Sequence, residues 1–345
     1  MMRAAFLALV SLTWSVAACG TDGAPDPYAT RTFELGPYPL APGQEVTTQC
    51  VSVTLHNDEP LYINQVELTT GPGFHHSNWF WVPENLFAGE DGTWTCADRN
   101  YRGEAAGLFG GILFAQSTQS PHEIQKFADG VGVKIPPHSK LIADTHMLNA
   151  GDTPLAPTLT LAITPIPEQE VTAKLVGMSL ENLTIALPPH KISRFTIECD
   201  MGPRHQDLLG RAPDFKIYYM LAHYHSLGAG MTLEGVRDSD GTVDMIHETP
   251  ARAGDALGAT IDPPFDVTGH GKLRFSCTFD NPRDTTVSWG VGDQEMCMFL
   301  AFTDSPYVWG GGAIDADAPG PSVEHDGLVE FTHPGCTVVA TDGQH

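Results

Sequence analysis

The 345-residue sequence predicts an all-β fold, and two observations carry that prediction. Glycine and proline are abundant, at 35 and 27 residues, and there is no long heptad or clear amphipathic helical repeat. Most apolar segments are short, alternate with polar residues and end at turn-forming residues, which is the pattern of half-buried strands. Together these features are typical of a loop-rich β protein.

Strands can be read along the first half of the chain. Residues 50–55 and 61–68 alternate apolar and polar side chains, and the turn formers 57–60 separate them. Further strands are expected at residues 141–149 and 159–163. The stretch from Pro83 to Gly111 is rich in Gly, Asp and Glu, and we expect it to be a loop.

A second set of strands begins after residues 165–170, which read as a linker. Strands are expected at residues 195–199, 231–236 and 273–279, and within 218–228. The sequence Ile-Pro-Pro-His at 135–138 returns as Leu-Pro-Pro-His at 187–190, a faint repeat that fits two similarly built domains. We therefore place an N-terminal domain at 33–165 and a C-terminal domain at 171–340.

Residues 1–19 are expected to be a signal peptide. A basic start precedes an apolar core at 4–14, which is too short to span a membrane. The small residues before Cys19 resemble the lipobox of bacterial lipoproteins, in which that cysteine is lipidated; the alternative is an ordinary signal peptide with Cys19 incidental. Residues 20–32 read as a tether. These features predict an exported protein of the bacterial cell envelope, held to a periplasmic or outer surface by a lipid anchor.

Charge and cysteine content limit the partners and the compartment. The formal charge, 18 − 42 = −24, argues against nucleic acid and against an anionic membrane surface. Six cysteines remain after Cys19. An even number in an exported chain suggests disulfides, with 15 possible pairings. No Cys-x-x-Cys pair is present, which disfavours a zinc ribbon or a thioredoxin-like site.

Three histidine-bearing segments suggest a metal site. His223 and His225 stand two residues apart in an apolar run, so both would face the same side of a strand. His75 and His76 are adjacent, so both can reach one ion only if the strand bulges or different ring nitrogens are used; Gly73 makes a bulge plausible. His146 lies on a separate predicted strand. Imidazole ligands suit copper, zinc, iron and nickel alike.

These segments occur in a characteristic order, ending in Asp293-Gln294-Glu295-Met296-Cys297. With Cys277-Thr278-Phe279-Asp280-Asn281 before that ending, the chain resembles the copper type II, ascorbate-dependent monooxygenases. This is the family of peptidylglycine α-hydroxylating monooxygenase and dopamine β-monooxygenase. The resemblance covers roughly residues 45 to 340.

The resemblance implies two jelly-roll β-sandwich domains that each carry one copper ion. One set of ligands would be His75, His76 and His146, storing an electron. The other, which binds O₂, would be the catalytic set His223, His225 and Met296. The implied reaction hydroxylates a C–H bond of a small molecule or peptide, with O₂ and ascorbate or a similar external reductant. The electron from the first copper would cross a cleft between the domains.

The resemblance also implies three disulfides: Cys50–Cys96, Cys199–Cys336 and Cys277–Cys297. Two positions that bind a substrate carboxylate in the peptide-amidating relatives are Leu221 and Leu300 here, which suggests a less polar substrate. Asp144 replaces a glutamine near His146, where it could tune the metal or simply face solvent.

Two other functions fit parts of the sequence. An exported lipoprotein that binds or sequesters copper would need metal ligands without oxygenase activity. A surface adhesin with incidental histidines would bind no stoichiometric metal. Because all six candidate ligands are present, we favour the enzyme, acting as a monomer.

Overall fold

The computed structural model describes residues 26–250, 252–290, 292–314 and 319–343. Within these residues the chain is nearly all β, as predicted. The helices are short: α1 (Gly103–Phe109), α2 (Gly202–Leu209) and 3₁₀ turns at Cys96–Arg99 and Glu168–Glu170. The predicted signal peptide and the lipidation site Cys19 lie outside the described residues. No helix within the described part of the chain has the length and apolar character needed to cross a membrane.

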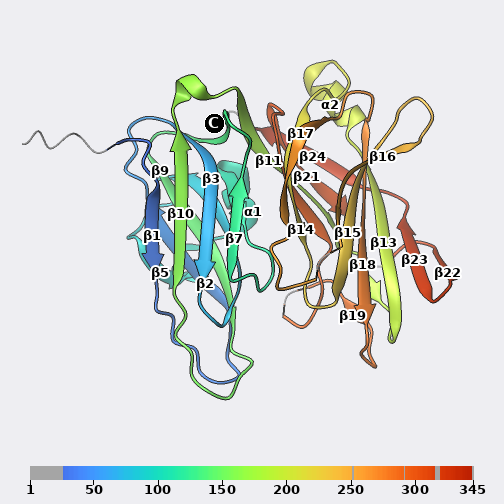
Figure 1. The fold of residues 1–345 in the computed structure, drawn as a ribbon, viewed down its shortest axis with the longest axis horizontal. Helices are drawn as coiled ribbons and strands as arrows, with labels where there is room; N and C mark the ends of the chain where they lie inside the picture. The colour runs from blue at the N-terminus through green and yellow to red at the C-terminus, as the bar shows by residue number, and fades with distance from the viewer. Residues whose placement is uncertain (1–25, 251, 291, 315–318, 344–345) are drawn as a thin grey trace, which may run out of the picture.

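The N-terminal half forms two facing sheets (Figure 1). One sheet has the order β5-β2-β9-β4-β6, and the other begins β1-β10-β3-β8, with β7 also paired to β3. The strands are β1 (Arg31–Leu35), β2 (Glu45–Thr54), β3 (Leu61–Thr70), β4 (Phe74–Pro83), β5 (Gly92–Thr95), β6 (Gly111–Ala115), β7 (His122–Lys126), β8 (Val131–Ile135), β9 (Ser139–Leu148) and β10 (Leu159–Ile166).

The C-terminal half repeats this two-layer plan. A sheet of order β16-β15-β18-β13-β23-β22 faces the strands β11-β20-β14-β17, with β21 and β24 attached through β11. Its strands are β11 (Ala173–Asn182), β12 (Ala186–Leu187), β13 (Lys191–Asp200), β14 (Lys216–His223), β15 (Gly228–Val236), β16 (Val243–Thr249), β17 (Gly258–Asp266), β18 (Lys272–Asn281), β19 (Val287–Ser288), β20 (Met298–Thr303), β21 (Tyr307–Ala313), β22 (Ser322–His325), β23 (Leu328–His333) and β24 (Thr337–Asp342).

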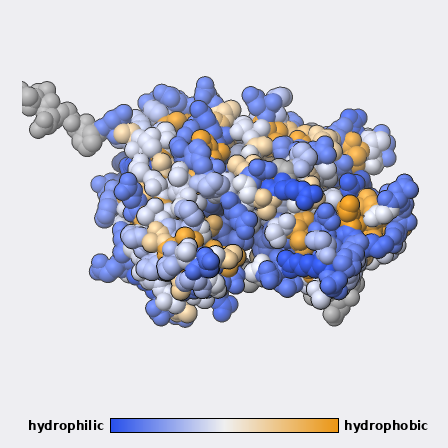
Figure 2. All heavy atoms as spheres, turned by 60° about the horizontal axis from the view of Figure 1, so that its bottom comes forward, coloured by the Kyte–Doolittle hydropathy of each residue, from blue (hydrophilic) through white to orange (hydrophobic). Residues whose placement is uncertain are grey.

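Side-chain alternation explains why these segments become strands. In β10, Leu159, Leu161 and Ile163 are fully buried, whereas the residues between them are half-buried. That is the period-2 pattern of a strand with one face on the core. In β14 every residue after Lys216 is buried, because the strand lies between β17 and β20 and is covered on both faces. Hydrophilic residues predominate on the face of the molecule drawn in Figure 2.

The two halves share one continuous sheet. β8 and β11 pair in parallel, with Val131 opposite Ala173, so the first sheet of the N-terminal half continues into the C-terminal half. Buried polar groups reinforce this joint: Ser117 Oγ accepts a hydrogen bond from the backbone amide of Leu257 at 2.8 Å and donates one to Glu123 at 2.6 Å. These contacts fix the position of one half relative to the other.

The described residues contain three disulfides, Cys50–Cys96, Cys199–Cys336 and Cys277–Cys297. These are the three pairings that the resemblance implies. They indicate an oxidising, exported environment for the protein.

The stretch from Pro83 to Gly111 is not the simple loop that we expected. It contains β5, a 3₁₀ turn and α1. The helix forms despite its glycines because Ala106 is fully buried against Val82 and Ile142. Tertiary packing therefore overrides the low helix propensity of this segment.

Candidate metal centre

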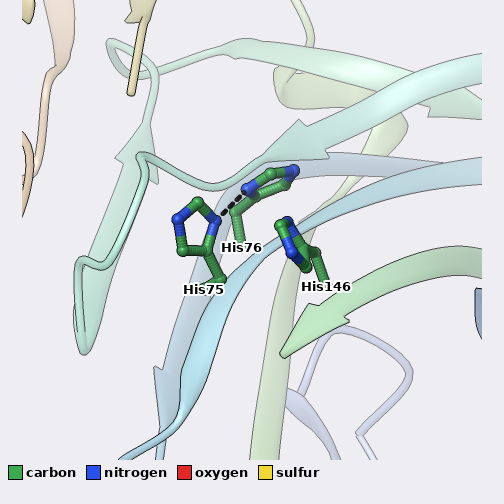
Figure 3. Close-up of side chains that lie close together, drawn as sticks. All are labelled: His75, His76 and His146. Carbon is green, nitrogen blue, oxygen red and sulfur yellow. Dashed lines mark hydrogen bonds between the residues drawn. The ribbon is translucent and has the colours of Figure 1, made fainter. Parts of the chain in front are cut away.

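A bulge in β4 brings His75 and His76 to the same site. Phe74 pairs with Met147 and His76 pairs with His146, so His75 is an extra residue at a register shift. The two Nδ1 atoms lie 3.0 Å apart (Figure 3). Of the two ways for adjacent histidines to reach one ion, a bulge is therefore present, at the position where Gly73 made it plausible.

His146 joins this pair from the neighbouring strand β9. Its ring centroid lies 4.4 Å from that of His75 and 5.1 Å from that of His76. Its Nε2 lies 2.8 Å from Glu45 Oε1, across 101 residues of sequence. A carboxylate bonded to one ring nitrogen fixes the ring and leaves the other nitrogen to face a metal, as at many histidine metal sites.

His223 is the last residue of β14, and His225 lies beyond the strand end. The expectation that both sit on one face of a regular strand is therefore wrong for His225. Its position is set by hydrogen bonds: its amide donates to Glu295 Oε2 at 2.8 Å, and its Nδ1 lies 2.8 Å from the carbonyl oxygen of Gln294. The two rings still meet, with centroids 5.6 Å apart.

Met296 follows this anchoring segment directly and is half-buried. The other carboxylate oxygen of Glu295 accepts a hydrogen bond from Leu227 N at 2.7 Å, and Cys297 is bonded to Cys277. The chain is thus fixed on both sides of Met296. Its role as a thioether ligand stays a prediction.

The two expected ligand sets form one cluster. Among the described residues, His75, His76 and His146 make one group able to hold a metal, and His76, His223 and His225 make another. The ring of His76 lies 5.2 Å from that of His223, and His75 lies 5.7 Å from His225. The expected cleft between the two ligand sets is therefore not present, because the halves are closed on each other and His76 belongs to both groups. That each set holds one copper ion stays a prediction.

The cluster is buried, and burial lowers the pKa of His75, His76, His223 and His225. The five rings are exposed by only 2–7%. Burial, and then the imidazoles of His146 and His225, lower the pKa of His75 to about 3. Burial, followed by His225 and His75, does the same for His223, and the pKa of His76 lies well below its usual value. Neutral imidazole is the protonation state that binds a metal.

The ring nitrogens fit a metal ion. Two nitrogen ligands at about 2.0 Å from one ion lie roughly 3 Å apart when the nitrogen–metal–nitrogen angle is about 90–110°. The Nδ1 atoms of His75 and His76 have this spacing. Among the described residues, His225 Nε2 is buried and has no hydrogen-bond partner. A buried nitrogen normally finds such a partner, so this free lone pair favours a ligand role.

Several supporting residues were missed from the sequence. Glu45 carries no local signal, since it lies far from His146 in the chain. Glu295 stands out in the sequence only as a neighbour of Met296, yet it positions His225. Asp144 is half-buried on β9, two residues before His146, and its tuning role stays a prediction.

No protein-family model and no curated protein matches this chain. Among solved structures, the major capsid protein P2 of bacteriophage PM2 matches 80% of this chain and 97% of its own length, at 9% identity and a TM-score of 0.29. PNGase F, a glycosylasparaginase from Flavobacterium meningosepticum, matches 90% of this chain and 99% of its own length, at 6% identity and a TM-score of 0.33. Likenesses this weak carry no argument about function.

Proposed function

We propose that this protein is an exported copper-dependent monooxygenase that hydroxylates a C–H bond of a small molecule or peptide. It would use O₂ and an ascorbate-like reductant, as the copper type II, ascorbate-dependent monooxygenases do. The observation that carries the proposal is the convergence of five buried histidines from both halves of the chain. Hydroxylation places one oxygen atom in the product and releases the other as water, with the reductant supplying the electron pair.

The candidate ligands are His75, His76, His146, His223, His225 and Met296. Copper bound there would supply one-electron redox chemistry and O₂ activation. The protein's own contribution is to hold the ligands: Glu45 orients His146, the Gln294 carbonyl orients His225, and the Glu295 carboxylate fixes the backbone that carries His225. Burial lowers the pKa of His75, His76, His223 and His225, which favours the unprotonated form that binds a metal.

The surroundings of the cluster favour a substrate of low polarity. Leu221 and Leu300 pair directly across β14 and β20, and both are buried. Leu221 lies two residues before His223, on the same face of β14. A pocket of about 340 Å³ reaches His75, and its lining, which includes Phe74, Gln119 and Leu148, holds no Asp, Glu, Lys or Arg among the described residues.

A second candidate is copper binding or sequestration without oxygenase activity. The specific observation in its favour is burial, because rings exposed by 2–7% leave little room for a substrate beside His223 and His225. Both candidates predict an exported protein, which the three disulfides support, and in both we propose that lipidated Cys19 anchors it to the cell envelope.

Copper content and turnover together separate these functions. The mature protein would be reconstituted with copper, freed of excess metal and analysed for metal per chain, with His223→Ala as the test variant and surface His122→Ala as the control. If the protein is a monooxygenase, we expect stoichiometric copper. We also expect reductant-dependent O₂ uptake, coupled to formation of a hydroxylated product from at least one member of a broad substrate panel. Stoichiometric copper without product would favour sequestration. A folded protein with no stoichiometric copper would exclude both functions and leave a binding module such as an adhesin.

A further inference from the structure

A second cavity lies at the joint between the two halves, away from the histidines. It has a volume of about 520 Å³ and is lined from both halves, by Trp81 and Lys134 on one side and by Lys174, Lys216 and Tyr218 on the other. Trp81 is five residues beyond His76 on β4, and Tyr218 is five residues before His223 on β14. At about 3.3 Å per residue, the cavity lies roughly 17 Å along both strands from the metal centre.

The cavity concentrates positive charge in a strongly acidic protein. The chain has only seven lysines, and three of them line this cavity. Against 42 acidic residues in the sequence, Asp304 is the one carboxylate among the described lining residues. The local charge is therefore opposite in sign to the net charge of −24.

Two of these lysines form no close ion pair, although Lys216 stands opposite Asp266 across β14 and β17 and helps to lower the pKa of that carboxyl, after its hydrogen bonds from Thr268. Elsewhere in the fold, Lys140, Lys191 and Lys272 each form an ion pair. No described Asp or Glu oxygen lies within ion-pair distance of Lys134 or Lys216. Lys174 has other partners: its Nζ forms a long ion pair with Glu168 at 4.0 Å and lies over the ring of Tyr62.

Asp304 is itself engaged by hydrogen-bond donors from the cavity wall. It accepts hydrogen bonds from the backbone amide of Lys216 at 2.6 Å and from the Tyr218 hydroxyl at 3.0 Å. With its oxygens occupied in this way, Asp304 holds the wall in place rather than pairing with a lysine ammonium group.

We propose that this cavity binds a small polyvalent anion, of the size and charge of a dicarboxylate or tricarboxylate, between Lys134 of β8 and Lys216 of β14. Ligand sites of this volume occur preferentially at interfaces between domains. Ammonium groups that form no close ion pair, in a partly enclosed space, attract a ligand with at least two negative charges more strongly than a monoanion. Because the lysines belong to different halves, the bound anion would bridge the joint and stabilise the folded protein.

The test uses succinate and citrate as probes, with neutral succinamide as the control ligand. Binding is followed by the fluorescence of Trp81 and by the increase in melting temperature at constant ionic strength. We expect saturable binding of citrate and succinate, with no response to succinamide. Trp81→Phe should remove the fluorescence change but keep the thermal shift.

Variants locate the site. Lys134→Gln and Lys216→Gln should each weaken citrate binding about tenfold or more, a loss of roughly 1.4 kcal/mol. Lys126→Gln is the matched control, because it removes the same charge from a strand outside the cavity and should bind as the parent protein does. The melting temperature of each variant without ligand checks that it is folded. The proposal is overturned if binding is absent, if succinamide binds equally, or if Lys126→Gln has the same effect as the cavity variants.

Discussion

The carboxylate of Glu295 accepts a hydrogen bond from the backbone amide of His225 at 2.8 Å. Its other oxygen accepts one from Leu227 at 2.7 Å, so one buried side chain fixes the turn that carries a candidate ligand. Burial raises the pKa of Glu295 to about 7, although these amide hydrogen bonds oppose the rise. The position of His225 thus depends on a residue that is not itself one of the candidate ligands.

We predict that Glu295→Gln weakens copper binding by about 10- to 100-fold, because the amide offers a single oxygen where the carboxylate offers two. Affinity would be measured by competition with a chromophoric copper chelator. Glu330→Gln, a surface change of the same kind, should have no effect. Equal affinities for the two variants would mean that Glu295 does not position the site.

His76 should be the most important histidine for metal content, since it belongs to both candidate ligand groups. We expect His76→Gln to reduce bound copper more than either His146→Gln or His225→Gln, each of which removes a ligand from one group. Metal analysis of the three variants after identical reconstitution provides the comparison. A loss no greater for His76→Gln than for His146→Gln would show that the groups bind independently.

The disulfide Cys277–Cys297 should support the metal centre as well as the fold. Replacing both cysteines with alanine opens a loop of sequence separation 20, and we expect a loss of about 3 kcal/mol of stability. Copper affinity should fall too, because Cys297 follows Met296. The double alanine variant of Cys50 and Cys96 opens a longer loop of separation 46. That control should lose at least as much stability in chemical denaturation and keep more of its copper affinity.

The metal-free protein should lose stability in acid. The folded pKa of His75 is about 3, below the usual 6.5, so the unfolded state binds more protons between these values. The stabilisation is complete above pH 6.5 and is lost as the pH falls toward 3, by up to about 3 kcal/mol at pH 4 for one such histidine. Glu295, whose pKa is raised to about 7, contributes in the opposite sense: its stabilisation is present at low pH and is lost as the pH rises toward 7.

The difference between parent and variant isolates the histidine contribution. Urea denaturation of the metal-free protein at several pH values should show a shallower acid loss for His75→Gln than for the parent. Parallel curves for the two proteins would contradict the lowered pKa of His75.

The fold class and part of the site could be predicted because their signals are local. Alternation predicts strands such as β10, and the adjacency of His75 and His76 together with Gly73 suggests the bulge that β4 contains. The disulfide pairings came from the family resemblance, since spacing alone leaves every pairing open. These are properties of short segments or of motif order.

What could not be predicted depends on contacts between distant parts of the chain. The approach of His223 to His76 follows from the closure of the two halves, and no periodicity encodes it. The same holds for Glu45, which meets His146 across 101 residues. His225 lies outside the expected strand because its amide and ring are hydrogen-bonded to Glu295 and Gln294, rather than its backbone to a neighbouring strand.

The parallel pairing of β8 with β11 also has a practical consequence for producing this protein. Either half expressed alone would expose a row of unpaired amides and carbonyls along β8 or β11. Such a bare sheet edge is a template for pairing with other chains, and hence for aggregation. The two halves are therefore expected to remain soluble only when they are made together as one polypeptide or co-expressed.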